Sequence, residues 1–80
     1  MARYLILIER GENNYGAYVP DVPGVIAVGD TVEEVTREMR EALEFHLEGL
    51  ALEGYPIPQP THTAAYVDVD LPSPSVMPKP

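Results

Sequence analysis

Short apolar segments with strand-like spacing alternate with turns along most of this chain. Residues 3–10, 15–19 and 25–28 are rich in β-branched and aromatic side chains and are separated by Gly, Pro, Asn and Asp. Each segment is predicted to be a β-strand, and the first two are predicted to form a hairpin. Residues 63–71 alternate between two rows of side chains with a period of two, which predicts a fourth strand.

The segment 32–52 has the spacing of an amphipathic helix. It contains no proline, and its apolar residues recur every three or four positions and share one face: Val32, Val35, Met39, Leu43, Leu47 and Leu50. Thr31 and Glu34 have the spacing of a capping box, so the helix is predicted to begin at Val32. Gly54, followed by prolines at positions 56, 58 and 60, predicts where the helix ends.

The predicted order is β-β-β-α-β, an α+β fold in which an antiparallel-rich sheet carries one long helix on one face. Residues 1–71 are predicted to form this domain, and residues 72–80 a Pro-rich C-terminal tail. One helix covers one face of a sheet, yet residues 3–10 are apolar on both sides. Exposing Ile6 and Ile8 to water would cost roughly 1.5 to 3 kcal/mol each. We therefore expect a second chain to cover them.

Composition narrows the classes of function. Eighty residues suffice for one domain, and 13 acidic against 5 basic residues give a net charge of −8, which disfavours direct contact with nucleic acid. The absence of cysteine excludes disulfides, a thiolate nucleophile and zinc ribbons, and is typical of a cytoplasmic protein. No apolar run is long enough to span a membrane. We expect no cofactor.

Few residues are candidates for chemistry. Asp68 and Asp70 point to the same side of the predicted fourth strand, where paired carboxylates bind magnesium or share a proton, and Asp21 is a possible third ligand. Alternatively, the two aspartates keep a sheet edge soluble. His46 and His62 lack further ligands at metal spacing, so we interpret both as structural. The balance favours a protein that is not an enzyme.

An interface is a more specific prediction than a catalytic site. Phe45 and Leu52 lie seven residues apart on a flank of the predicted helix, outside its apolar stripe. The predicted contacts with a partner or with another copy are the apolar and acidic residues left without a cover: Ile6, Ile8, Phe45, Leu52, Tyr66, Asp68 and Asp70.

Four motifs together resemble the HicB-like antitoxin family. They are YVPDVPG at 18–24, VGDTVEEV at 28–35, EAL at 41–43 and GYPIP at 54–58, and the resemblance covers residues 3–71. The family's pattern is an aromatic-rich strand, a P-D-L-P-G-C turn, a G-D-T/S-x-E-E-A helix start and I-P-x-P after the helix. The usual cysteine of the turn is Val25 here.

The resemblance implies a partial ribonuclease-H-like fold and the antitoxin half of a type II toxin–antitoxin pair. The implied partner is a small basic HicA-like toxin that cleaves mRNA using a histidine, and the implied inhibition is steric. An acidic module with excess apolar surface suits a basic partner. Many family members carry a C-terminal DNA-binding segment. This chain resembles a minimal form without one, so operator binding is not expected.

Three functions remain open at this point. The first is a non-catalytic antitoxin-like module that neutralises the toxin by protein–protein contact and itself associates as a dimer or tetramer. The second is an orphan oligomeric scaffold or regulator that keeps the fold without a toxin. The third is a metal-dependent nuclease remnant that uses Asp68, Asp70 and Asp21.

Overall fold

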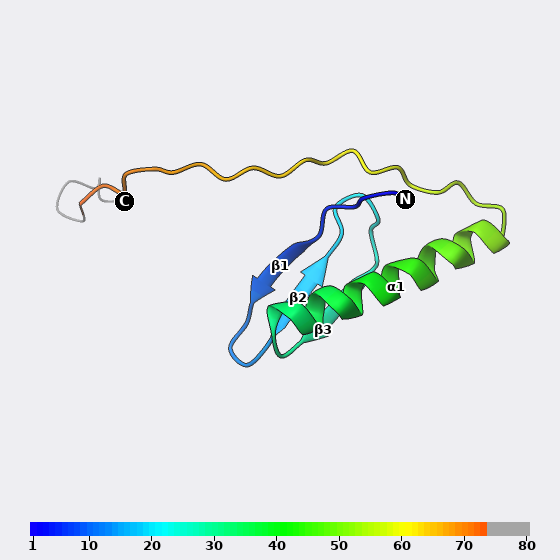
Figure 1. The fold of residues 1–80 in the computed structure, drawn as a ribbon, viewed down its shortest axis with the longest axis horizontal. Coiled ribbons are helices and arrows are strands. Elements are labelled where there is room, and N and C mark those ends of the chain that lie inside the picture. The colour runs from blue at the N-terminus through cyan, green and yellow to red at the C-terminus, as the bar shows by residue number, and fades with distance from the viewer. Residues whose placement is uncertain (74–80) are drawn as a thin grey trace, which may run out of the picture.

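A computed structural model of the chain describes residues 1–73, which form one sheet and one helix. The elements are β1 (Leu7–Arg10), β2 (Tyr15–Tyr18), β3 (Ile26–Gly29) and α1 (Val32–Leu52). The strands form an antiparallel sheet in the order β1-β2-β3, and α1 crosses one face of it (Figure 1). The predicted α+β fold with antiparallel strands and one long helix is confirmed. The expected tail at 72–80 lies outside the described residues from position 74 onward.

Strand β1 is shorter than the predicted segment 3–10. It pairs with β2 through Leu7 opposite Tyr18 and ends the hairpin at Arg10 opposite Tyr15. Continuing this register toward the N-terminus would place Pro20 opposite Leu5. Proline has no N–H to donate to a ladder, so the pairing stops and residues 1–6 lead into the strand without joining it.

Both ends of α1 are fixed by local hydrogen bonds. At the start, the Glu34 amide donates to Thr31 Oγ1 at 3.0 Å, as the capping box predicts. At the end, Gly54 adopts a φ of 76°, and the amides of Gly54 and Tyr55 donate to the carbonyls of Ala51 and Leu50 at 3.1 and 2.9 Å. This is the Schellman arrangement, which explains why the helix ends at its predicted residue.

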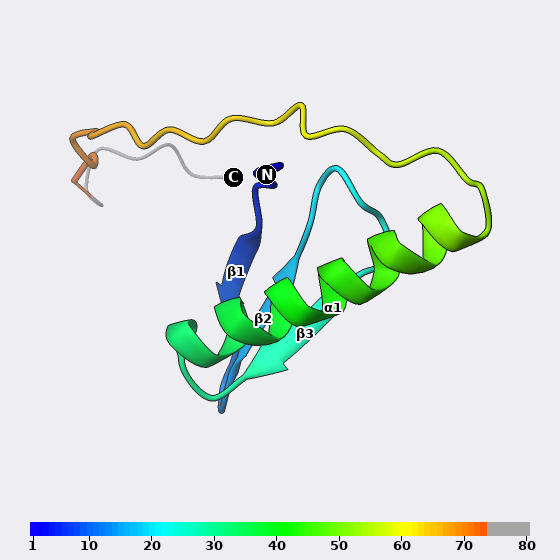
Figure 2. The same cartoon turned by 45° about the vertical axis from the view of Figure 1, so that its right-hand side comes forward.

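The core lies between α1 and the sheet, mainly over β2 and β3 (Figure 2). Helix residues Val35, Met39 and Leu43 are buried there, as their spacing predicts. Their partners are small and β-branched residues of β2 and of the following loop: Ala17, Val19, Val22 and Val25. Gly29, at the end of β3, is buried against the backbone of the first turn of α1. Within residues 1–73, no comparable cover extends over β1.

The predicted fourth strand is the main error of the sequence-based fold. Residues 63–71, which we call the arm, are extended and exposed, and they pair with no strand among residues 1–73. Figures 1 and 2 show the chain returning from the end of α1 past the N-terminal segment and then leading away from the sheet. The alternating pattern is that of a strand, but the chain by itself offers the arm no aligned edge.

Candidate functional site

Asp21 holds the chain segment from which the arm departs. One carboxylate oxygen accepts hydrogen bonds from the amides of Thr61 and His62 at 2.9 and 3.2 Å. The other lies 2.6 Å from both Thr61 Oγ1 and His62 Nδ1. The side chain of Asp21 is only 6% exposed, whereas that of His62 is 51% exposed. We call this group the Asp21 clamp; it joins two segments forty residues apart.

The hydrogen bonds of the clamp determine the charge of Asp21. Hydrogen bonds hold the pKa of Asp21 well below its usual range, and the bond from the Thr61 hydroxyl has the largest effect. Burial of the carboxylate acts in the opposite direction. Asp21 is therefore a carboxylate that only accepts. His62 must carry its proton on Nδ1 to make the 2.6 Å contact.

The clamp is positioned by the turn that contains Asp21. Val19 before the turn, Val22 within it and Val25 after it are all buried, and the Val22 amide donates to the carbonyl of Val19 at 3.1 Å. Gly24 has a φ of 92°, which only glycine adopts readily. The P-D-x-P-G turn is thus fixed in the core and presents one carboxylate to residues 55–62, which follow α1 and which we call the linker.

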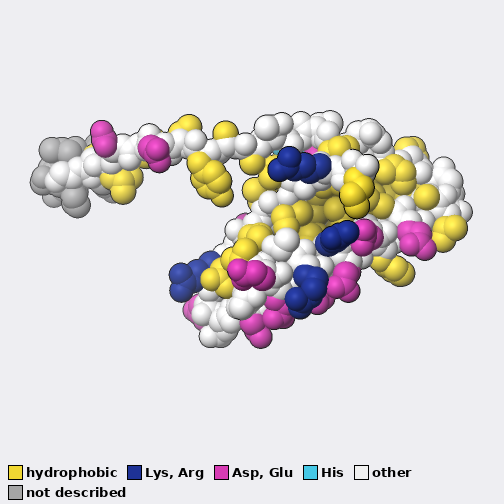
Figure 3. Space-filling view, in the orientation of Figure 1, with side chains coloured by type: hydrophobic (Ala, Val, Ile, Leu, Met, Phe, Trp, Pro, Cys, Tyr) yellow, Lys and Arg dark blue, Asp and Glu magenta, His cyan; other side chains and the backbone are white. Residues whose placement is uncertain are grey.

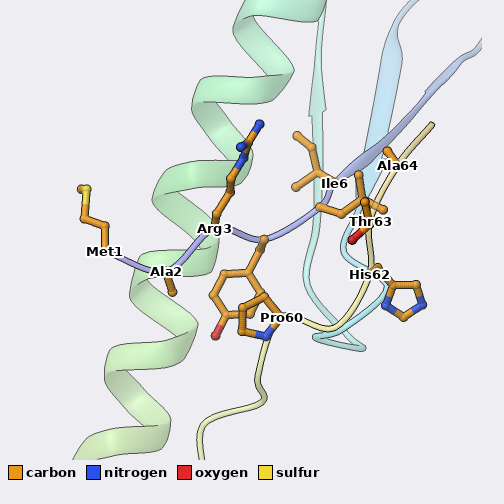
Figure 4. Close-up of a pocket in the computed structure, with 10 residues that line it drawn as sticks. Met1, Ala2, Arg3, Ile6, Pro60, His62, Thr63 and Ala64 are labelled. Carbon is orange, nitrogen blue, oxygen red and sulfur yellow. The ribbon is translucent and has the colours of Figure 1, made fainter. Parts of the chain in front are cut away.

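A second contact holds the linker near the N-terminal segment. The hydroxyl of Tyr4 donates to the carbonyl of Pro58 at 2.5 Å. Residues 62–64 then lie beside the N-terminal lead-in and line a pocket with it, as the close-up of Thr63 and Ala64 next to Ile6 shows (Figure 4). The arm is therefore fixed at its base by two contacts with different parts of the fold.

Beyond its base the arm is bare. Tyr66 is 100% exposed, and the apolar row contributes Val67, Val69 and Leu71 at 81%, 69% and 85%. Asp68 and Asp70 are exposed on the opposite row. Tyr66, Asp68 and Asp70 are thus available for contact, as an interface candidate must be, but they lie on a projection and not in a sheet (Figure 3).

The helix presents a second exposed surface. Phe45 and Leu52 are each 81% exposed and share a side of α1 with three exposed carboxylates, since all five are spaced by three or four residues: Glu38, Glu41, Phe45, Glu48 and Leu52. We call this set the Phe45 stripe. Such large apolar side chains among acidic ones are unusual for a surface that faces only water.

The sheet has an uncovered apolar face, but Ile6 and Ile8 are not on it. Both are half-buried and pack against the core on the helix side. The uncovered face instead carries Leu7, Tyr18 and Ile26, which are aligned by the strand register, with Val28 two residues along. The alternation along residues 3–10 gave the two faces correctly, but not which of them the helix covers.

A groove of about 610 Å³ separates the N-terminal segment from α1. Its apolar lining comes from Ile6 on one side and from Met39, Leu43 and Leu47 on the other, and Arg3 and Arg40 stand at its rim. Figure 3 shows this hollow as a gathering of hydrophobic side chains bordered by basic ones. Helix α1 therefore leaves the β1 side of the core partly open.

The described residues do not assemble a metal-binding group. Among residues 1–73, no three His, Cys, Asp or Glu side chains converge. Both carboxylate oxygens of Asp21 contact Thr61 and His62. Asp68 and Asp70 lie on the arm, away from Asp21. Within the same part of the chain, no helix has the length and hydropathy needed to cross a membrane.

Comparison with models of known protein families shows to which family the chain belongs. Residues 4–71 match the model of a family described as HicB_like antitoxin of bacterial toxin-antitoxin system. The chain belongs to the HicB-like antitoxin family. The resemblance carried by the P-D-x-P-G turn and the G-D-T-x-E-E helix start is thereby confirmed, and it covers the sheet, the helix, the clamp and the arm.

Relatives of this antitoxin-like chain come from a phage and from bacteria. An uncharacterized 14.9 kDa protein from Haemophilus phage HP1 is 35% identical over 65 residues, which are 81% of this chain and 49% of the phage protein. A UPF0150 protein of Synechocystis is 35% identical over 57 residues, 70% of this chain and 72% of the relative. A UPF0150 protein of Thermotoga maritima is 51% identical over 44 residues, 55% and 59% respectively. The chain thus spans about half the length of the phage relative.

A solved structure has the same fold. A chain of the HicA3 and HicB3 toxin-antitoxin complex aligns with a TM-score of 0.65 and 32% sequence identity, covering 75% of this chain and 70% of that chain. The likeness extends the family assignment from sequence to three dimensions.

The Asp21 clamp is what sequence reasoning missed. Asp21 stood out only as a turn residue and as a possible third ligand for Asp68 and Asp70. Its partners, Thr61 and His62, lie in the Pro-rich segment after the helix, and nothing local signals the pairing. The one available hint was the joint presence of the P-D-x-P-G and I-P-x-P motifs in one family pattern.

Proposed function

We propose that this protein is a non-catalytic cytoplasmic antitoxin that neutralises a small basic HicA-like toxin by protein–protein contact. Membership of the HicB-like family and similarity to a chain from a toxin–antitoxin complex support this role. The formal charge of −8 suits a basic partner, because opposite charge accelerates encounter. We further propose that the antitoxin self-associates as a dimer or tetramer.

The observation that carries the proposal is the Phe45 stripe. An aromatic side chain that is 81% exposed in the middle of a well-formed helix contributes little to the packing of residues 1–73. Aromatic anchors ringed by polar groups are the usual centre of binding energy at interfaces. Here the ring consists of Glu41 and Glu48, so the complementary surface is an apolar pocket bordered by Lys or Arg.

Inhibition on this model is steric. The stripe runs over four turns of α1, from Glu38 to Leu52, or roughly 20 Å at 1.5 Å per residue. A surface of this length covers a substantial part of a small toxin. We place Phe45 and Leu52 at the contact with the toxin, and the acidic residues between them opposite basic groups that would otherwise bind RNA phosphates.

An orphan oligomeric scaffold is the second candidate. It is favoured by the uncovered sheet face and the bare arm, since these surfaces are available whether or not a toxin exists. The two candidates differ in one measurable respect: only the antitoxin binds and silences a toxin, whereas both self-associate.

The test uses calorimetric titration of a small basic HicA-like protein, taken from the neighbouring gene where that gene encodes one. Wild-type antitoxin should bind it, and Phe45→Glu should weaken binding by about 30-fold or more, corresponding to an anchor of at least 2 kcal/mol. Ala51→Glu is the matched control, because it adds the same charge at an exposed α1 position off the stripe. Equal affinity of both variants would remove the stripe from the interface, and absence of binding by the wild type would favour the scaffold.

A further inference from the structure

The arm has the composition and conformation of a β-strand that lacks a sheet. It is extended, it carries the β-branched Val67 and Val69 in one row, and its large side chains are exposed. Within residues 1–73, no backbone hydrogen bond joins residues 63–71 to the body of the fold. A nine-residue strand of this kind spans about 30 Å, long enough to pair along a whole edge.

The base of the arm is held so that the arm leaves its own sheet. The Asp21 clamp fixes Thr61 and His62, and the bond from Tyr4 fixes Pro58, before the chain turns outward (Figures 1 and 4). Pairing with its own β1 would require these contacts to break or the linker to bend back. A second copy removes this conflict, because its edge meets the arm where the arm already points.

The sheet offers two free edges, and charge distinguishes them. The edge of β1 with its lead-in carries Arg3 and Arg10 against a single Glu9. The β3 edge ends at Asp30 and lies beside Glu33 and Glu34 in the first turn of α1. The arm brings Asp68 and Asp70, which the three carboxylates at the end of β3 repel. At the β1 edge their side of the sheet carries a single carboxylate, Glu9, and the apolar row of the arm meets the groove between the N-terminal segment and α1.

We propose that the arm adds as a fourth strand along the free edge of β1 in a second copy of this chain, and that two copies exchange arms reciprocally. The row of Val67, Val69 and Leu71 enters the groove between the N-terminal segment and α1, which is lined by the half-buried Ile6 and by the edge of the core at Leu43. The row with Asp68 and Asp70 faces the opposite side. Exchange of an identical element is a common route to symmetric dimers.

The proposal deepens the self-association proposed above and is independent of the toxin. It also brings five predicted interface residues to one place: Ile6 and Ile8 on the receiving strand, and Tyr66, Asp68 and Asp70 on the arm. The remaining two, Phe45 and Leu52, stay available for the toxin on the far side of α1 from the core.

The first test is light scattering of the full chain during size exclusion at micromolar concentration. Wild type should show twice the 8.8 kDa of one chain, or a multiple of that dimer. Val67→Pro removes a strand N–H and should weaken the dimer by about tenfold or more, with an unchanged circular dichroism spectrum because Val67 is 81% exposed. Val67→Thr, which keeps the β-branch, should remain close to wild type.

The second test locates the edge, using the natural absence of cysteine. Asp68→Cys is mixed with tagged Glu9→Cys or with tagged Asp30→Cys, and a short bismaleimide is added. The arm should cross-link to the β1 variant and not to the β3 variant. The reverse pattern, or a Val67→Pro dimer as stable as wild type, overturns the exchange but leaves self-association intact.

A third readout separates arm exchange from toxin binding. Val67→Pro should retain wild-type affinity for the HicA-like protein, measured by the titration described above. Lost affinity together with an unchanged mass would assign the arm to the toxin and would overturn the exchange. A wild-type chain that is a monomer at all concentrations tested would overturn both the exchange and the proposed self-association.

Discussion

Gly29 is the position at which the structure predicts the sharpest steric penalty. An added Cβ would lie 2.7 Å from the Val35 amide nitrogen and 3.0 Å from its Cα. Reaching the 3.4 Å of ordinary contact requires the start of α1 to move away from β3 by about 0.7 Å. Because the obstacle is backbone, no side-chain rotation relieves it.

The expected loss of stability in Gly29→Ala follows from the cost of overpacking. Forcing an extra methyl into a packed site costs roughly 1 to 3 kcal/mol, offset by about 0.4 to 1 kcal/mol from the lower entropy of the unfolded chain. Gly29→Ala should therefore lose about 1 to 2 kcal/mol. For a domain of this size that loss lowers the melting temperature by roughly 5 to 15 °C.

A matched control substitution, Gly49→Ala, should change the free energy of unfolding in the opposite direction. Gly49 lies in α1 with nothing within 4 Å of an added Cβ, so Gly49→Ala should gain about 1 kcal/mol from helix propensity. Both variants are melted at one fixed concentration, since association shifts the midpoint. A Gly29→Ala protein as stable as wild type, with Gly49→Ala raised as expected, would refute the packing of α1 on β3 described here.

Three further predictions concern the core and the base of the arm. Met39→Ala, at a site 1% exposed, should lower the free energy of unfolding by about 2 to 5 kcal/mol in urea; a loss below 1 kcal/mol would mean that the helix does not rest on this residue. Tyr4→Phe removes the donor to Pro58 and should cost about 0.5 to 1.5 kcal/mol with no change of fold, and equal stability would contradict the hydrogen bond. Because the folded pKa of Asp21 is lowered, the stability contributed by the clamp is fully present above the ordinary value near 4, declines as the pH falls below it, and is lost only as the pH falls through the lowered pKa of the folded state. Wild type should accordingly melt above Asp21→Ala at pH 7, with a gap that narrows steadily as the pH is lowered below about 4; a gap independent of pH would contradict the clamp.

Local signals in the sequence were sufficient for the helix. Thr31, the apolar spacing and Gly54 act within a few residues of one another, so α1 begins and ends where they predict. The three strands were found for the same reason. The strand at 63–71 was wrong because pairing is a property of two segments, and alternation in one of them does not supply an edge.

The candidate surfaces depended on information that is absent from local patterns. Phe45 and Leu52 are exposed as predicted because a position outside the apolar stripe of a helix follows from spacing alone. Ile6 and Ile8 were placed on the wrong face because periodicity does not say which side of a sheet the helix covers. The Asp21 clamp joins residues forty positions apart and required the folded chain.

The central claim is neutralisation of a toxin, and RNA cleavage tests it most directly. The HicA-like protein used in the titration is incubated with a labelled mRNA fragment while the wild-type antitoxin is added in increasing amounts. We expect cleavage to fall in proportion to the antitoxin and to cease near stoichiometric equivalence. Full cleavage of the RNA at a large excess of the antitoxin would contradict the proposed function.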